Sequence, residues 1–81
     1  SDLSDLDNLE RWFVDNTGLG NRSNQLIRYA LLLMEMGADE PTIETKVKDL
    51  NAKLPNKLSN EEINNTIMVT VAKRIAAAQK P

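Results

Sequence analysis

The chain of 81 residues contains no cysteine and no histidine. Without cysteine it has no disulfide and no thiolate metal site, and without histidine the commonest general base and zinc ligand are missing. A Ser-His-Asp arrangement is therefore impossible. The sequence also lacks a P-loop, and Gly18-Leu19-Gly20 lacks the third glycine of a dinucleotide-binding turn. We therefore expect a domain that is not an enzyme by itself and that has no catalytic residues, no metal ligands and no cofactor of its own.

Glycine, proline and aromatic residues are also scarce: three glycines, three prolines, and one each of tryptophan, phenylalanine and tyrosine. With 41% hydrophobic residues, this composition favours a single all-helical domain over residues 1–81. No apolar run approaches the roughly 18 residues that span a membrane, and no signal peptide is visible. We therefore expect a cytoplasmic location and no membrane partner. Because the sequence begins without methionine, we expect a fragment of a larger protein, and the alternative is a processed or tagged chain.

The net charge of −2 is unevenly distributed. Residues 1–19 contain five acidic residues and one basic residue, whereas residues 20–81 contain nine basic and seven acidic residues. The acidic first segment would repel nucleic acid, but the mildly basic remainder permits contact with phosphate.

Hydrophobic periodicity predicts four helices at about 4–15, 22–36, 40–54 and 60–78. Their short connections favour antiparallel neighbours, so we predict a small all-α four-helix bundle. The second helix is apolar around most of its circumference, which places it at the centre of the bundle. Its polar side is one narrow stripe containing Asn21, Asn24, Gln25, Arg28 and Glu35.

The ends of the predicted helices contain typical capping residues. The expected N-caps are Ser4, Asn21 and Ser59, and Gly37 is the expected C-cap of the second helix. On the third helix, Glu44–Lys48 and Asp49–Lys53 have the spacing of favourable ion pairs.

The adjacent aromatics Trp12 and Phe13 lie on an amphipathic helix. We expect both in the core, and the alternative is that they stack on nucleic-acid bases. Tyr29 is also expected in the core, with its hydroxyl group at the rim.

The start of the second helix is the sharpest candidate for a binding site. Helix N-termini present unpaired N–H groups and partial positive charge, and here Arg22 and Arg28 lie close to several amide side chains. This combination suits phosphate. The alternative is structural: Asn21 caps the helix and the arginines pair with acids such as Asp15 or Glu35.

Two segments, GNRSNQLIRYALLLMEMG and IETKVKDLNAKLPNKLSNEEI, resemble the primase C-terminal helical domain. This helix bundle occurs in phage and plasmid primase-polymerases and in replication initiators. The resemblance covers roughly residues 20–75, and the matching positions are Gly20, Arg22, Leu26, Ala30, Gly37, Asn51, Pro55, Leu58, Glu62 and Ile63. The chain departs from the family pattern at Ser23, where the family has asparagine, and in having one proline instead of a pair.

The resemblance implies a noncatalytic module of a DNA primase-polymerase that assists template DNA binding or primer initiation. The alternative is a protein-docking module that links the primase to a helicase, and a third possibility is a spacer between two enzymatic domains. The implied partners are template or single-stranded DNA and the catalytic and helicase domains of the same chain. The parent enzyme would use Mg or Mn and nucleoside triphosphates, and would be phage- or plasmid-encoded in a bacterial or archaeal host.

The residues that this resemblance and the helix start propose for DNA or phosphate binding are Asn21, Arg22, Asn24, Gln25, Arg28, Lys53, Lys57, Lys73 and Arg74. For the last four, solvated surface charge is the alternative. Asn51 matches a family asparagine, but we expect it to be buried and to tie the loop after Leu54 to its helix.

Overall fold

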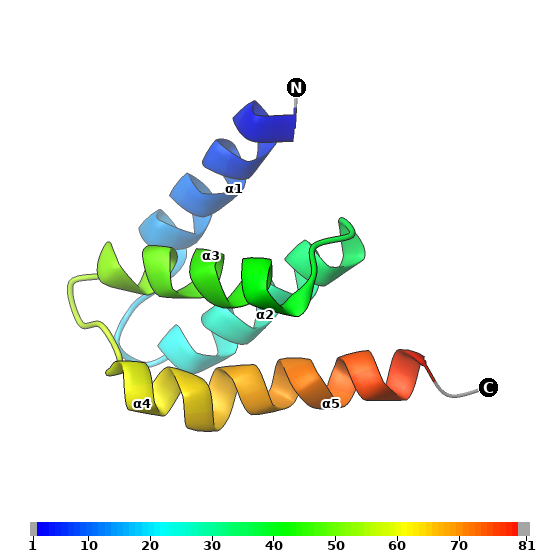
Figure 1. Ribbon diagram of the computed structural model, residues 1–81. Coiled ribbons are helices and arrows are strands. Elements are labelled where there is room, and N and C mark those ends of the chain that lie inside the picture. The colour runs from blue at the N-terminus through cyan, green and yellow to red at the C-terminus, as the bar shows by residue number, and fades with distance from the viewer. Residues whose placement is uncertain (1, 80–81) are drawn as a thin grey trace.

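The computed structural model describes the backbone of residues 2–79 and the side chains of residues 6–79. Three helices, α1 (Asp2–Asn16), α2 (Arg22–Glu35) and α3 (Glu40–Ala52), precede a longer helical run. That run consists of α4 (Asn60–Glu62), a π-helical segment η1 (Ile63–Ile67) and α5 (Met68–Ala78) (Figure 1). Residues 2–79 include no strand. The predicted all-α fold and the four predicted helices are confirmed.

The second helix, α2, is central, as its apolar circumference predicted. It contacts α1, α3, η1 and α5. In Figure 1, α3 crosses in front of α2, the α4–α5 run passes beneath both, and α1 leans away at an angle. The core is formed by the fully or almost fully buried side chains Phe13, Leu26, Tyr29, Ala30, Leu33, Ile43, Val47, Leu50, Leu54, Leu58, Ile63, Ile67, Met68 and Val71.

Gly37 ends α2 as predicted. Its φ of 94° lies in the left-handed region that glycine adopts without steric penalty. The N–H of Gly37 donates to the carbonyl of Met34, and the N–H of Ala38 donates to the carbonyl of Leu33. This pair of bonds is a Schellman motif, which satisfies carbonyl groups at the end of the helix and turns the chain toward α3.

The N-caps of the helices agree only in part with those predicted from the sequence. Ser59 caps α4, because its Oγ accepts from the N–H of Glu62 at 3.1 Å, and Asp39 caps α3 by accepting from the N–H of Thr42. The Thr42 hydrogen bonds hold the pKa of Asp39 below its usual value. Ser4 is not a cap, because α1 already begins at Asp2.

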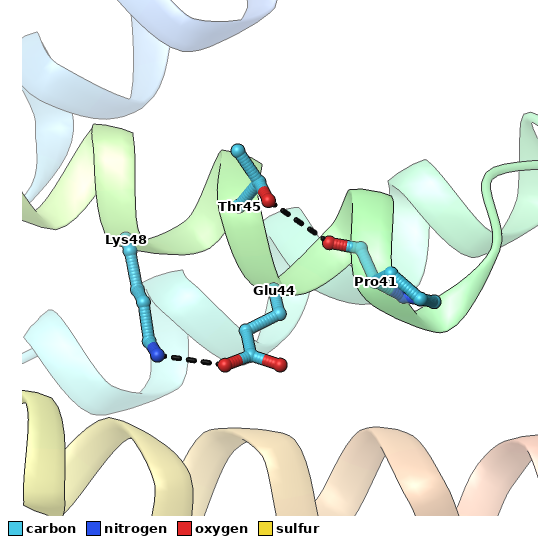
Figure 2. A network of polar contacts seen from close by, with 4 residues as sticks. All are labelled: Pro41, Glu44, Thr45 and Lys48. Carbon is cyan, nitrogen blue, oxygen red and sulfur yellow. Dashed lines mark hydrogen bonds and ion pairs between the residues drawn. The ribbon is translucent and has the colours of Figure 1, made fainter.

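Of the two ion pairs predicted along α3, Glu44–Lys48 forms and Asp49–Lys53 does not. Lys48 pairs with Glu44 at 2.7 Å, and the Thr45 hydroxyl donates to the Pro41 carbonyl at 3.0 Å (Figure 2). The predicted Asp49–Lys53 pair is wrong, because Lys53 instead forms an ion pair with Glu10 of α1. A partner on another helix is therefore preferred over the neighbour one turn away.

Asn51 has the structural role expected from the sequence. Its side chain is 4% exposed, and its amide donates to the Leu58 carbonyl at 2.7 Å while its oxygen accepts from the Leu58 N–H at 2.8 Å. The two bonds fasten the loop between α3 and α4 to the last turn of α3. That loop contributes to the candidate site below.

The π-helical segment was not predicted from the sequence. Buried residues Ile63, Ile67 and Val71 recur at a constant spacing of four, and on an ideal α-helix such a stripe drifts about 40° per step. A single wider turn takes up part of that drift. All three side chains therefore stay buried along one helical run.

Candidate nucleic-acid interface

The loop between α1 and α2 is held by Asn21. Its Oδ1 accepts from the N–H of Gly18 at 2.6 Å, and its amide donates to the Asn16 carbonyl at 3.2 Å. Asn21 occupies the N-cap position but makes no capping hydrogen bond. The predicted N-cap position is confirmed, but the capping hydrogen bond does not form, because this side chain bonds back toward α1 instead of over the first turn of α2.

The first turn of α2 consequently keeps its N–H groups available. Gln25 is the first residue whose N–H has a backbone acceptor, the Asn21 carbonyl at 2.9 Å. Within the described part of the chain, no oxygen accepts from the N–H groups of Arg22, Ser23 or Asn24. These groups give the start of the helix partial positive charge.

Gln25 is buried and serves the packing of α1 against α2. Its amide donates to the Asn16 carbonyl at 3.3 Å, and its oxygen accepts from the Arg28 guanidinium at 3.2 Å. The carbonyl of Asn16 at the end of α1 thus accepts from both Asn21 and Gln25. The side chains of Asn21 and Gln25, two of the candidate phosphate ligands, therefore already form hydrogen bonds within the domain.

Arg22 lies at the corner between α2 and the loop that follows α3. It is partly buried, and its guanidinium donates to the Asn56 carbonyl at 2.9 Å. A hollow of about 80 Å³ adjoins it, lined by Thr17, Gly18, Arg22, Leu54, Pro55 and Asn56. Such a volume admits a small anionic group or a few waters, but no base.

Two further features make this corner polar. The Thr17 hydroxyl is buried and has no hydrogen-bond partner among the described atoms. Lys57 follows Asn56 directly and is exposed.

Neither Arg22 nor Arg28 forms an ion pair with any carboxylate of residues 6–79. The alternative in which acids neutralise both arginines therefore does not hold within that range.

Arg28 lies on a different side of α2 from Arg22. The two residues are six positions apart, which rotates one side chain from the other by about 240° around the helix axis. Arg28 is exposed and lines a shallow surface with Leu31, Leu32 and Glu35. Arg22 and Arg28 therefore do not form one site.

The remaining basic candidates are dispersed. Lys53 is paired with Glu10, and the hydrogen bond that its ammonium group donates to this carboxylate raises the pKa of Lys53. Lys73 and Arg74 are exposed on α5. Lys73 is thirteen positions after Asn60, where the helical run begins next to the α3–α4 loop. This separates the two basic residues from the start of the run by about 20 Å along its axis. Of the nine sequence candidates, Arg22 and the exposed Asn24 lie in the first turn of α2, and the exposed Lys57 follows Asn56, whose carbonyl accepts from Arg22.

The aromatic residues divide between the core and the surface. Phe13 is buried and meets Tyr29 edge-on at 5.3 Å, as predicted for the core. Trp12 is 47% exposed and stacks edge-on against Phe13 at 4.9 Å. The prediction that Trp12 belongs to the core is wrong, because α1 contacts the bundle through the side that carries Phe13.

Tyr29 is fully buried, and its hydroxyl group has no hydrogen-bond partner among residues 6–79. The expected position of the hydroxyl at the rim is therefore wrong. Burial, with further contributions from the carboxylates of Glu10, Asp49 and Asp7, raises the pKa of Tyr29 to about 12.

Sequence reasoning missed two contributors to the corner, Thr17 and the backbone of Asn56. The only sequence signal for Asn56 is its position after Pro55 in a loop. Its carbonyl meets Arg22 because Asn51 fixes that loop, which is a contact between segments 34 residues apart.

The chain was compared with known proteins. No family model, curated protein or solved structure matches it. Within the described residues, no helix is long and apolar enough to cross a membrane, and no group of three or more acidic side chains is arranged to hold a metal ion.

Proposed function

We propose that this chain is a noncatalytic helix-bundle module of a replication protein of the primase-polymerase type, and that it assists in holding template or single-stranded DNA. The observation that carries the proposal is the corner at the start of α2. There Arg22 donates to a backbone carbonyl and not to a carboxylate, beside N–H groups without acceptors. A phosphate group fits this combination of a guanidinium and a helix N-terminus.

We expect the affinity of this corner for DNA to be limited. Arg22 lines the hollow, the exposed Lys57 directly follows Asn56 of its lining, and the acidic α1 adds opposing charge to the domain. Binding through so few phosphate contacts is expected to be weak and to fall as salt rises. A module of this kind supports a larger DNA-binding protein by contributing one contact, and the sequence resemblance to the primase C-terminal helical domain agrees with that role.

The test is a titration of the domain with a single-stranded oligonucleotide at several salt concentrations. The double variant Arg22→Ala/Lys57→Ala is expected to lower affinity about tenfold or more, since hydrogen bonds to charged groups contribute about 1.5–3 kcal/mol each. The slope of log affinity against log salt should shrink by about 1.4 for single-stranded DNA.

The matched control is Lys73→Ala/Arg74→Ala. It removes the same two charges from an exposed part of α5 and should change affinity by less than about threefold, a difference of roughly 0.7 kcal/mol. Equal losses in the two double variants would show nonspecific attraction, and absence of binding by the unmodified domain at low salt would refute the proposal. Thermal melting of both variants checks that the fold is retained.

Protein docking is the second candidate, favoured by the half-exposed Trp12 on an acidic helix. Asp7, Glu10 and Asp15 lie on α1 with it, and a basic partner surface would match their charge. Amide chemical shifts distinguish the two. Changes at residues 17–24 and 56–57 on adding DNA support the first proposal, whereas changes limited to α1 on adding the catalytic or helicase domain support docking.

A further inference from the structure

The outward side of α2 carries a short stripe of mixed character that the rest of the bundle leaves uncovered. It consists of Arg28, Leu31, Leu32 and Glu35, which together line a shallow surface hollow of about 200 Å³. Leu32 is 36% exposed, Leu31 is partly buried, and both charged residues are exposed. We call these four residues the α2 stripe.

The two charges of the α2 stripe are not neutralised within residues 6–79. Arg28 donates to the amide of Gln25, and neither Arg28 nor Glu35 belongs to an ion pair in that range. They are seven residues apart, so they lie on the same side of the helix but are separated by about 10.5 Å along its axis. That distance is too great for a direct pair, and each charge therefore lacks an oppositely charged partner among the described side chains.

The order of residues in the α2 stripe is symmetric. The midpoint between Leu31 and Leu32 is also the midpoint between Arg28 and Glu35. If a second α2 runs antiparallel across it on a two-fold axis, residue n faces residue 63 − n of the other copy. Arg28 then faces Glu35 twice, and Leu31 faces Leu32 twice.

We propose that the α2 stripe is a self-association surface that pairs two copies of this chain through antiparallel α2 helices. An isologous contact requires a surface that complements itself, and the α2 stripe meets that condition in both charge and apolar contact. A partner with charge of one sign would match only one of the two ionic residues. A second copy matches both and covers the leucines.

The size of the surface sets the strength of the association. Four residues per copy bury far less than the roughly 800 Å² per partner of a standard stable interface. The dimer is therefore weak and forms at high local concentration. In the dimer the two Arg22 corners lie at opposite ends of the helix pair, about 28 Å apart along the axis.

Sedimentation equilibrium over protein concentrations from about 10 µM to 1 mM tests the proposal. The unmodified chain should show a reversible monomer–dimer equilibrium. Arg28→Glu places two acidic residues opposite each other at both ends of the contact, and Glu35→Arg places two basic residues there. Each single variant should raise the dissociation constant at least tenfold. The double variant Arg28→Glu/Glu35→Arg exchanges the charges and should restore it to within about threefold.

Two controls make the test specific. Arg74→Glu changes the same charge on α5 and should leave the dissociation constant unchanged, whereas Leu32→Ser should weaken association without changing the charge. Circular dichroism checks that each variant is folded. A chain that stays monomeric throughout the range, a double variant that fails to recover, or an Arg74→Glu variant as weak as Arg28→Glu would each overturn the proposal. If the chain is monomeric and only DNA or another protein shifts the amide signals of the stripe, the surface has a different occupant.

The sedimentation experiment contains no nucleic acid, and every variant keeps Arg22 and Lys57. Its failure would therefore leave the proposed DNA-binding corner untouched, and loss of DNA binding would say nothing about the dimer.

Discussion

Replacing Asn51 by alanine would test how the α3–α4 loop is held. The change removes both hydrogen bonds to Leu58, at 2.7 and 2.8 Å, and leaves the N–H and carbonyl of a residue that is 5% exposed without partners. A buried polar group left unsatisfied costs about 1–3 kcal/mol. Since the loop lies near the surface and water can reach one group after relaxation, we expect a total loss of about 2–4 kcal/mol.

Such a loss is large for this protein. A domain of 81 residues has a free energy of unfolding of about 4–12 kcal/mol. The melting temperature should therefore fall by about 8–32 °C, at roughly 4–8 °C per kcal/mol for a chain of this size. Thermal and urea unfolding followed by circular dichroism measure the effect.

The matched control is Asn8→Ala, an asparagine that is exposed on α1. It should be neutral or slightly stabilising, because alanine has the higher helix propensity. Asn51→Asp gives a second check. Its carboxylate can accept from the Leu58 N–H but cannot donate to the carbonyl, so stability should be low at neutral pH and recover partly when acid protonates the carboxyl group. Equal stabilities of Asn51→Ala and Asn8→Ala would refute the proposed role.

Three further changes address the core and its boundaries. Gly37→Ala should cost about 1–2 kcal/mol in chemical unfolding, because φ of 94° is strained for any residue with a Cβ atom; an unchanged midpoint would contradict the Schellman assignment. Phe13→Ala should cost about 3–5 kcal/mol and release α1, seen as loss of amide-exchange protection in residues 6–16; retained protection there would show that α1 is held by other contacts. Tyr29→Phe should be neutral or stabilising by about 1 kcal/mol, because it removes a buried hydroxyl without a partner. In the unmodified chain the folded state holds the Tyr29 proton more tightly than the unfolded state. The free energy of unfolding should therefore not depend on this titration below pH 10 and should fall as the pH rises from 10 toward about 12. Phenolate absorbance follows this single tyrosine, and an ordinary midpoint near pH 10 would contradict the burial argument.

Several features of the site were predictable because they depend on local sequence. The boundaries of α2 follow from hydrophobic periodicity and from Gly37, and the cap at Ser59 follows from the residue types around it. Asn51 was predictable too, because an asparagine seven residues before its partner acts within one loop. In each case the atoms that interact are close in the chain.

Other features required the packed structure. Asn21 has the sequence of a cap but turns toward the Asn16 carbonyl, and Lys53 pairs with Glu10 instead of Asp49. Trp12 and Phe13 are neighbours in sequence, yet only one of them enters the core. These outcomes depend on the direction in which α1 approaches α2 and α3.

The sequence by itself thus determined the four helical segments, their order and most of the apolar residues that they bury, since each depends on the spacing of residues along a single helix. Only the tertiary structure decided which polar groups remain available at the surface. A side chain with several possible hydrogen-bond partners takes the one that packing brings within reach, and Arg22 meets Asn56 only after α2 and the α3–α4 loop have been placed side by side.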